Sequence, residues 1–235
     1  MYLNSFHTSD DQIVRITPEQ GSRFAKEVSD DFNPLHNHDS KRFCVPGDLL
    51  FALSLARYGI AQSMAFKYTG MVGKDVDLVF PAETADAFSI KDVNDKPYLE
   101  ISRTGEINQN LALIEAFSRA YVAFSGHSFP HILVPLMEQN NVMINPEKPM
   151  VIYESMAFEF DHQDANQPVL ELVDSSLEMN GKRGLVRMQF AINENGESIG
   201  SGYKTMVLSG LRDYDQELID GLIEQYEQAK TAYRT

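Results

Sequence analysis

Apolar residues recur on nearly every face of the segment from Gly47 to about Tyr68. They would point in all directions around a helix: Leu49, Leu50, Leu53, Leu55, Ile60, Met64 and Phe66. A helix with a single apolar stripe lies on a surface, whereas a helix that is apolar all round is buried. The sequence therefore predicts a central helix over residues 47–66, enclosed by other elements.

Strand patterns and turn signals accompany this helix in the first half of the chain. A helix is predicted ahead of it, where Thr17 and Pro18 are typical of a helix start. Strands are expected at residues 11–16, 75–80, 87–93, 97–106 and 111–126. The last segment could be strand or helix. We favour a strand because its apolar and small residues hold a period of two from Ile114 to Phe124.

The second half repeats this order of elements. A proline-rich stretch at residues 127–149 divides the chain into halves of residues 1–126 and 127–235. A short helix is expected near residues 131–140, followed by four strands with hairpin turns at Asn180-Gly181 and Asn195-Gly196. A terminal surface helix completes the chain. The pattern predicts an α+β fold in which a helix and an antiparallel sheet occur twice.

Composition limits the partners and the compartment. The formal net charge of −14 argues against nucleic acid, which requires a basic face, and against anionic lipid. The N-terminus lacks the basic start and apolar core of a secretory signal, and no apolar run is long enough to span a bilayer. The single Cys44 agrees with a reducing compartment. We therefore expect a cytoplasmic protein with no membrane partner and no cofactor.

The stretch DDFNPLHNHD, residues 30–39, concentrates acid, base and amide groups just before the predicted central helix. Asp31 and His36 are candidates for acid–base catalysis, and Pro34 restricts the backbone between them. A metal site using His36, His38 and Asp39 is a weaker alternative, because no third histidine lies nearby. A further alternative is a capping turn whose side chains bind only local backbone.

The same stretch carries a resemblance to a known family. DDFNPLH resembles the GDxNPxH signature of MaoC-like dehydratases and R-specific enoyl-CoA hydratases, with matches at Asp31, Asn33, Pro34, Leu35 and His36. Residues 45–50 resemble the turn that enters the helix of the hot-dog fold in this family. The resemblance implies a double hot-dog fold, a catalytic pair of Asp31 and His36, a ligand contact by Asn33, and a thioester oxygen bound by the Gly47 amide.

Two positions depart from the family pattern, and two cations follow the loop. Asp30 replaces the glycine before the catalytic aspartate, and Pro46 replaces the histidine before the helix glycine. Asp30 would either raise the pKa of Asp31 by like-charge repulsion or point to solvent. Lys41 and Arg42 could bind a phosphate-bearing ligand, with a solvated charge pair as the alternative.

Three functions therefore stay open. The first is a hydratase or dehydratase of a trans-2-enoyl-CoA type thioester, using Asp31 and His36. The second is a non-catalytic protein that binds acyl-CoA or a similar small ligand, and the third is a structural protein that retains only the fold. The second half has no counterpart of the D-x-N-P-x-H loop, so at most one site per chain is expected. Association into a homodimer is left open.

Overall fold

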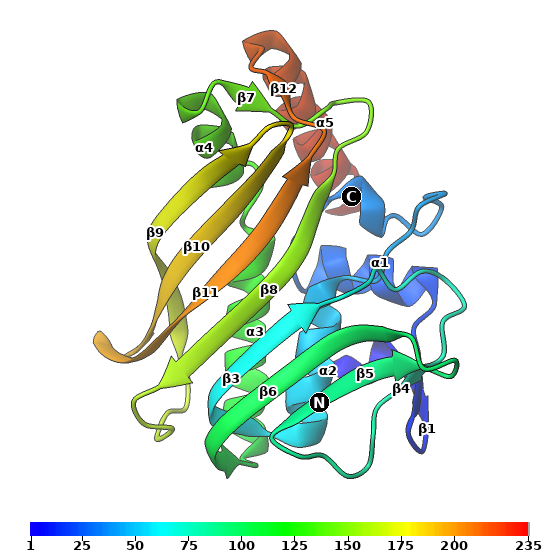
Figure 1. Cartoon of the computed structure of the whole chain (residues 1–235), viewed down its shortest axis with the longest axis vertical. Helices are drawn as coiled ribbons and strands as arrows, with labels where there is room; N and C mark the ends of the chain where they lie inside the picture. Colours follow the sequence, from blue (N-terminus) through cyan, green and yellow to red (C-terminus); the bar gives the residue numbers. More distant parts are fainter. Residues whose placement is uncertain (235) are drawn as a thin grey trace.

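The computed structural model describes residues 1–234 and contains one continuous ten-stranded sheet (Figure 1). The strand order is β1-β2-β4-β5-β6-β3-β8-β11-β10-β9, and neighbouring strands pair antiparallel. Its strands are β1 Thr8–Asp10, β2 Ile13–Arg15, β3 Ile60–Tyr68, β4 Leu78–Val79, β5 Ala87–Asp92, β6 Pro97–Asn108, β8 Val151–Phe160, β9 Val169–Asn180, β10 Arg183–Glu194 and β11 Glu197–Ser209. A small second sheet pairs β7 Val142–Met143 with β12 Arg212–Asp213.

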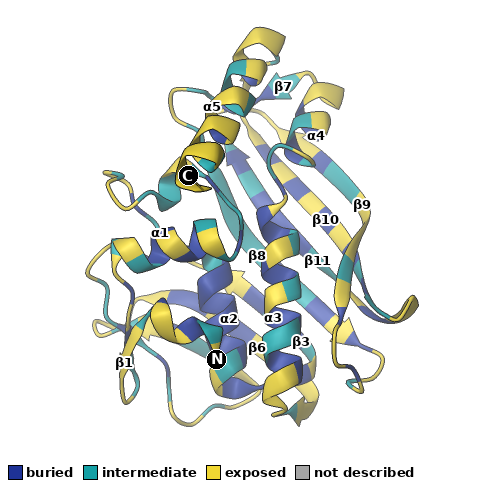
Figure 2. Ribbon diagram, turned by 180° about the vertical axis from the view of Figure 1, so that it is seen from behind, coloured by how far each residue is buried: buried dark blue, intermediate teal, exposed yellow. Residues whose placement is uncertain are grey.

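Two long helices lie on one face of this sheet (Figure 2). They are α2 and α3, which pack against each other, while α1, α4 and α5 lie toward the rim. The helix bounds are α1 Pro18–Glu27, α2 Gly47–Tyr58, α3 Leu111–Gly126, α4 Leu133–Gln139 and α5 Gln216–Arg234, with short 3-10 turns η1 Tyr2–Ser5 and η2 Pro34–His36. Two helices packed side by side on one face of a curved antiparallel sheet form a double hot-dog, so the predicted α+β fold is confirmed.

The two halves share one sheet because β3 of the first half pairs with β8 of the second. The ladder runs from Ser63 opposite Glu159 to Lys67 opposite Ser155. Both predicted hairpins of the second half are present: Asn195-Gly196 connects β10 to β11 as predicted, whereas the turn between β9 and β10 is one residue later, at Gly181-Lys182. The division of the chain at residue 126 coincides with the end of α3 and stays a prediction.

The segment 111–126 is a helix, so the strand predicted there is wrong. Its buried residues are Leu113, Ile114, Phe117, Ser118, Tyr121, Val122, Ser125 and Gly126, which follow the spacing of three and four that defines one face of a helix. The Asn110 side chain accepts a hydrogen bond from the Ala112 amide and caps the first turn. The period of two arose because Ile114, Ser118 and Val122 on the buried face alternate with the half-buried residues Ala116, Ala120 and Phe124.

The helix predicted over residues 47–66 ends earlier, at Tyr58. Gly59 has a φ of +80°, which interrupts the helix and starts β3. A Cβ at Gly59 would also lie 2.8 Å from the carbonyl oxygen of Asn108. The prediction of an enclosed helix is otherwise confirmed, because all eight residues from Asp48 to Leu55 are buried, and Tyr58 is buried as well.

Aromatic side chains fill the space between the helices and the sheet. Phe51 of α2 packs on Phe66, Phe117, Tyr121 and Phe158, which come from β3, α3 and β8. A second apolar cluster lies between α4, α5 and strands β9 to β11. The polar loop that carries Asp31 enters α2 between these two clusters, at the N-terminal end of the helix.

Candidate functional site

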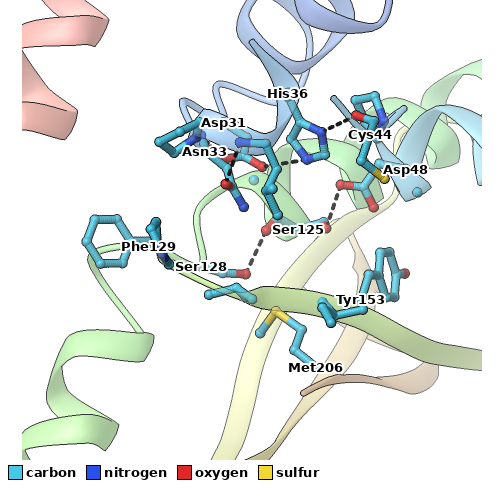
Figure 3. A pocket seen from close by; sticks show the side chains of 18 of the residues that line it. Asp31, Asn33, His36, Cys44, Asp48, Ser125, Ser128, Phe129, Tyr153 and Met206 are labelled. Atoms are coloured by element: carbon cyan, nitrogen blue, oxygen red, sulfur yellow. Dashed lines mark hydrogen bonds and ion pairs between the residues drawn. The ribbon is translucent and has the colours of Figure 1, made fainter. Parts of the chain in front are cut away.

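A cavity of about 390 Å³ opens at the N-terminal end of α2 (Figure 3). This volume is in the range of small-molecule sites, roughly 300 to 1,000 Å³. Residues from both halves line it, including the loop 31–37, the start of α2, the end of α3, and parts of β8, β11 and α5. Its far wall is apolar and contains Leu133, Ile144, Val151, Met206 and Leu222. The polar loop therefore faces a cavity of the size of a small-molecule site.

A chain of local hydrogen bonds fixes the loop. Asp31 Oδ1 accepts the Asn33 backbone amide at 2.9 Å, and Asn33 Oδ1 accepts the Leu35 amide at 3.1 Å. The His36 amide then bonds the Asn33 carbonyl at 2.9 Å and closes the turn η2. These are Asx turns, as the capping alternative expected. Asp31 Oδ2 takes no part in them, and it faces His36.

The imidazole of His36 is held with one defined nitrogen toward Asp31. Its Nδ1 lies 2.7 Å from the carbonyl oxygen of Cys44, and its Nε2 lies 3.7 Å from Asp31 Oδ2 (Figure 3). A carbonyl oxygen only accepts hydrogen bonds, so Nδ1 carries the proton. In the neutral ring, Nε2 is therefore an acceptor, and it points with the carboxylate oxygen toward the same space.

The N-terminus of α2 lies beside this pair. No side chain caps the helix, and Pro46, Gly47 and Asp48 all line the cavity. Tyr68 donates its hydroxyl to the Gly47 carbonyl at 2.9 Å, and a Cβ at Gly47 would lie 2.9 Å from the Tyr153 ring. The first amides of a helix have no partner within the helix and attract negative charge. Gly47 has no side chain because the rings of Tyr153 and Tyr68 occupy that space, where a Cβ would lie 2.9 Å and 3.1 Å from them.

Sequence reasoning missed a second polar cluster that lines the same cavity. Asp48 Oδ2 accepts a hydrogen bond of 2.7 Å from Ser125 Oγ, and Lys204 Nζ donates to the same Ser125 oxygen. All three side chains are buried, and they come from α2, α3 and β11. The available signal was charge on an apolar face, because Lys204 shares the inward side of β11 with Met206 and Leu208.

The structure shows what the departure at Asp30 does. Asp30 does not face the cavity; its carboxylate accepts hydrogen bonds from Lys230 at 2.5 Å and Arg234 at 2.7 Å, both in α5. The Tyr226 hydroxyl of the same helix donates to the Asp30 carbonyl at 3.0 Å. Asp30 has a φ of +53°, in the left-handed region that glycine tolerates best and aspartate better than most residues. Asp30 therefore does not point to solvent, because it pairs with Lys230 and Arg234 and fastens α5 to the site loop.

Replacing Asp30 with asparagine should loosen α5. Asparagine accepts the positive φ but carries no charge for Lys230 and Arg234, so we expect the free energy of unfolding to fall by about 1 kcal/mol. We also expect faster protease cleavage within α5, and a smaller difference from wild type at 1 M salt. Glu100→Gln removes an exposed partner of Lys67 and is the matched control. Equal cleavage rates for both variants would contradict this role.

The remaining predicted residues lie outside the cavity. Lys41 and Arg42 are exposed on the loop between Asn37 and Cys44, two residues that do line it. His38 and Asp39 are exposed as well, so they do not join His36 as a ligand set. Within residues 1–234, no group of three or more histidine, cysteine, aspartate or glutamate side chains is arranged to hold a metal ion.

Cys44 is a half-buried residue at the wall of the cavity. Burial raises the pKa of the Cys44 thiol to about 12, and its Sγ donates to the Val45 carbonyl at 3.3 Å. At pH 8 we therefore expect a disulfide reagent to modify the native thiol about a thousandfold more slowly than the thiol of the urea-unfolded chain. Comparable rates in both states would show that the thiol is exposed.

The family to which this chain is assigned covers almost its full length. The family described as "Protein of unknown function (DUF3581)" matches residues 1–217. The chain belongs to this family. A comparison with curated proteins found none that matches.

Solved structures with a similar arrangement include thioesterases and a dehydratase. The tesB protein of Mycobacterium avium subs paratuberculosis is 11% identical with a TM-score of 0.45, covering 72% of this chain and 89% of that one. The acyl-CoA thioesterase II TesB2 of Mycobacterium marinum is 12% identical with a TM-score of 0.42, covering 92% and 99%. A MaoC-like dehydratase is 9% identical with a TM-score of 0.43, covering 87% and 98%.

Among residues 1–234, no helix combines the length and the apolar character needed to cross a membrane.

Proposed function

We propose that this chain hydrates a trans-2-enoyl thioester, or dehydrates the corresponding 3-hydroxyacyl thioester, through Asp31 and His36. The observation that carries the proposal is the pair itself: Asp31 Oδ2 and His36 Nε2 lie 3.7 Å apart at the wall of a cavity that also receives the N-terminus of α2. Hydration requires a base for water, an acid for the α carbon, and donors for the enolate oxygen. The cavity brings candidates for all three together.

The orientation of His36 suggests how water would be held. Asp31 Oδ2 and His36 Nε2 are both acceptors when the imidazole is neutral, so one water can donate one proton to each. Asp31 acts as the base in this scheme. The water oxygen bonds to C3 while its proton moves to Asp31, the C2=C3 double bond opens, and charge reaches the thioester oxygen. The proton on Asp31 then passes to C2, and the carboxylate is restored.

The other predicted residues take supporting roles in this proposal. The Gly47 amide binds the thioester oxygen, where the helix dipole opposes the enolate charge. The Asn33 side chain holds the turn through the Leu35 amide and lines the cavity next to the acyl group. Lys41 and Arg42 would bind phosphate groups of a carrier outside the cavity, because their loop begins and ends at cavity-lining residues.

A panel of enoyl-CoA thioesters tests the proposal. Crotonyl-, octenoyl- and longer enoyl-CoA are incubated with the protein, and the loss of the conjugated thioester is followed together with release of free thiol. Hydration with no thiol release is the expected result, with one ligand bound per chain. Thiol release instead would indicate thioester hydrolysis. Binding without turnover would favour a non-catalytic acyl-CoA binder, and no binding would reduce the loop to a structural turn.

A further inference from the structure

We infer that the buried cluster of Asp48, Ser125 and Lys204 is a binding site for a hydroxyl group on the acyl chain of the ligand. This inference rests on the proposed function, because it concerns the acyl thioester that would bind in the same cavity. It specifies that the acyl chain carries a hydroxyl group near the thioester and is not a plain alkyl chain. The cluster lies beside the Asp31 and His36 pair and shares no hydrogen bond with it among the described residues.

Unused hydrogen-bonding capacity in this cluster points to a ligand. Asp48 is only 8% exposed, and its Oδ1 has no hydrogen-bond partner within residues 1–234. Lys204 is 5% exposed, and Ser125 Oγ is the one acceptor that the described residues give its ammonium group. An ammonium group has three protons to donate, and a carboxylate oxygen accepts at least one. Asp48 and Lys204 both line the cavity, next to the space that a bound molecule would fill.

A purely structural role accounts poorly for this arrangement. Removing a carboxylate and an ammonium from water is costly, and apolar residues of similar size often serve stability as well or better. Burial raises the pKa of Asp48 and lowers the pKa of Lys204, and the charge of each opposes the shift of the other. The cluster also joins three elements from both halves of the chain at the cavity wall. Buried groups of this kind that face a cavity are candidates for function.

The chemistry of the cluster selects a hydroxyl group. A hydroxyl can donate its proton to Asp48 Oδ1 and accept a proton from Lys204 Nζ, which satisfies both groups at once. A plain methylene chain would leave the Asp48 oxygen unpaired and displace any water from it. Asp48 follows Gly47 directly, so the hydroxyl would lie close to the thioester, at C2 or C4 of the acyl chain. The Tyr153 ring, 4.4 Å from Lys204 Nζ, closes the site on one side.

Equilibrium binding to the wild-type protein tests the inference without any substitution. Butyryl-CoA is compared by calorimetry with 2-hydroxybutyryl-CoA and 4-hydroxybutyryl-CoA, which lack the 3-hydroxyl that dehydration would remove. We expect at least one hydroxylated ligand to bind about tenfold to a hundredfold more tightly, the usual effect of a hydrogen bond to a charged group. Affinities within twofold of butyryl-CoA for both would overturn the inference and leave the proposed function intact. If no thioester binds, the proposed function falls and the inference with it.

Matched variants locate the preference. Lys204→Met keeps the approximate length of the side chain and removes its donors. The affinity for the hydroxylated ligand, divided by the affinity for butyryl-CoA, should therefore fall to about one. Lys67→Met, on the exposed side of β3, should keep the wild-type ratio. If Lys204→Met does not fold, Ser125→Ala removes the bridging hydroxyl and is measured in the same way. A folded variant of Lys204 or Ser125 that retains a tenfold preference would overturn the inference.

Discussion

Replacing Asp31 with asparagine is expected to lower the rate of enoyl-thioester hydration by about a hundredfold to ten-thousandfold. The substitution removes the carboxylate that faces His36 Nε2 at 3.7 Å and puts an amide in its place. An amide cannot take a proton from water. The Asn oxygen can still accept the Asn33 backbone amide, as Asp31 Oδ1 does at 2.9 Å, so the turn should survive. The measurement is kcat/KM for the best enoyl-CoA of the panel.

A matched control separates catalysis from folding. Asp39→Asn makes the same chemical change at an exposed position of the same loop, and its rate should equal that of wild type. The thermal unfolding temperatures of both variants should lie close to that of wild type, because the turn is retained. A large loss of stability in Asp31→Asn, in proportion to its loss of activity, would support the capping alternative. His36→Ala should lower the rate in the same range and leaves Asp31 in place.

The sheet and its hairpins could be predicted because their signals are local. Gly181, Asn195 and Gly196 have the positive φ that tight hairpin turns require, and a turn lies at each predicted hairpin, over residues 181–182 and 195–196. The strand predicted at residues 111–126 was wrong because its small and apolar residues alternate while its larger residues recur at helical spacing. Phe117 and Tyr121, four residues apart, carry the stronger signal, since large side chains decide which face is buried.

The part of the candidate site that lies in one loop could be predicted, and the part formed by distant residues could not. Asp31, Asn33 and His36 lie within six residues, so a motif could bring them together before any tertiary contact was known. Ser125 reaches Asp48 because α3 packs against α2, and Lys204 of β11, in the second half, reaches Ser125 only through the tertiary fold. Their pairing spans 77 and 79 residues along the chain, and no local pattern encodes such a contact. The contacts of Asp30 with Lys230 and Arg234 span 200 and 204 residues along the chain, and they were not predicted either.

The close approach between Ser29, where the site loop begins, and the end of α3 predicts a large loss of stability for Gly126→Ala. Gly126 ends α3, and a Cβ there would lie 1.6 Å from the carbonyl oxygen of Ser29, which is backbone and cannot rotate away. The loop that begins at Ser29 carries Asp30 and Asp31, so relieving the clash must move the site loop away from α3. We expect the free energy of unfolding to fall by about 3 kcal/mol or more, toward the upper end of overpacking effects. Chemical denaturation measures it directly.

The same substitution elsewhere in the chain provides the control for Gly126. Gly221 lies inside α5, and a Cβ at that position has no atom within 4 Å. Gly221→Ala should therefore raise stability by about 0.5 to 1 kcal/mol through helix propensity, the opposite sign from Gly126→Ala. Hydration should fall in Gly126→Ala even below its unfolding transition, because Asp31 moves relative to His36 and α2. A Gly126→Ala protein as stable as wild type would mean that Ser29 and α3 are not in contact, and that the site loop is held by α5 and its own turns alone.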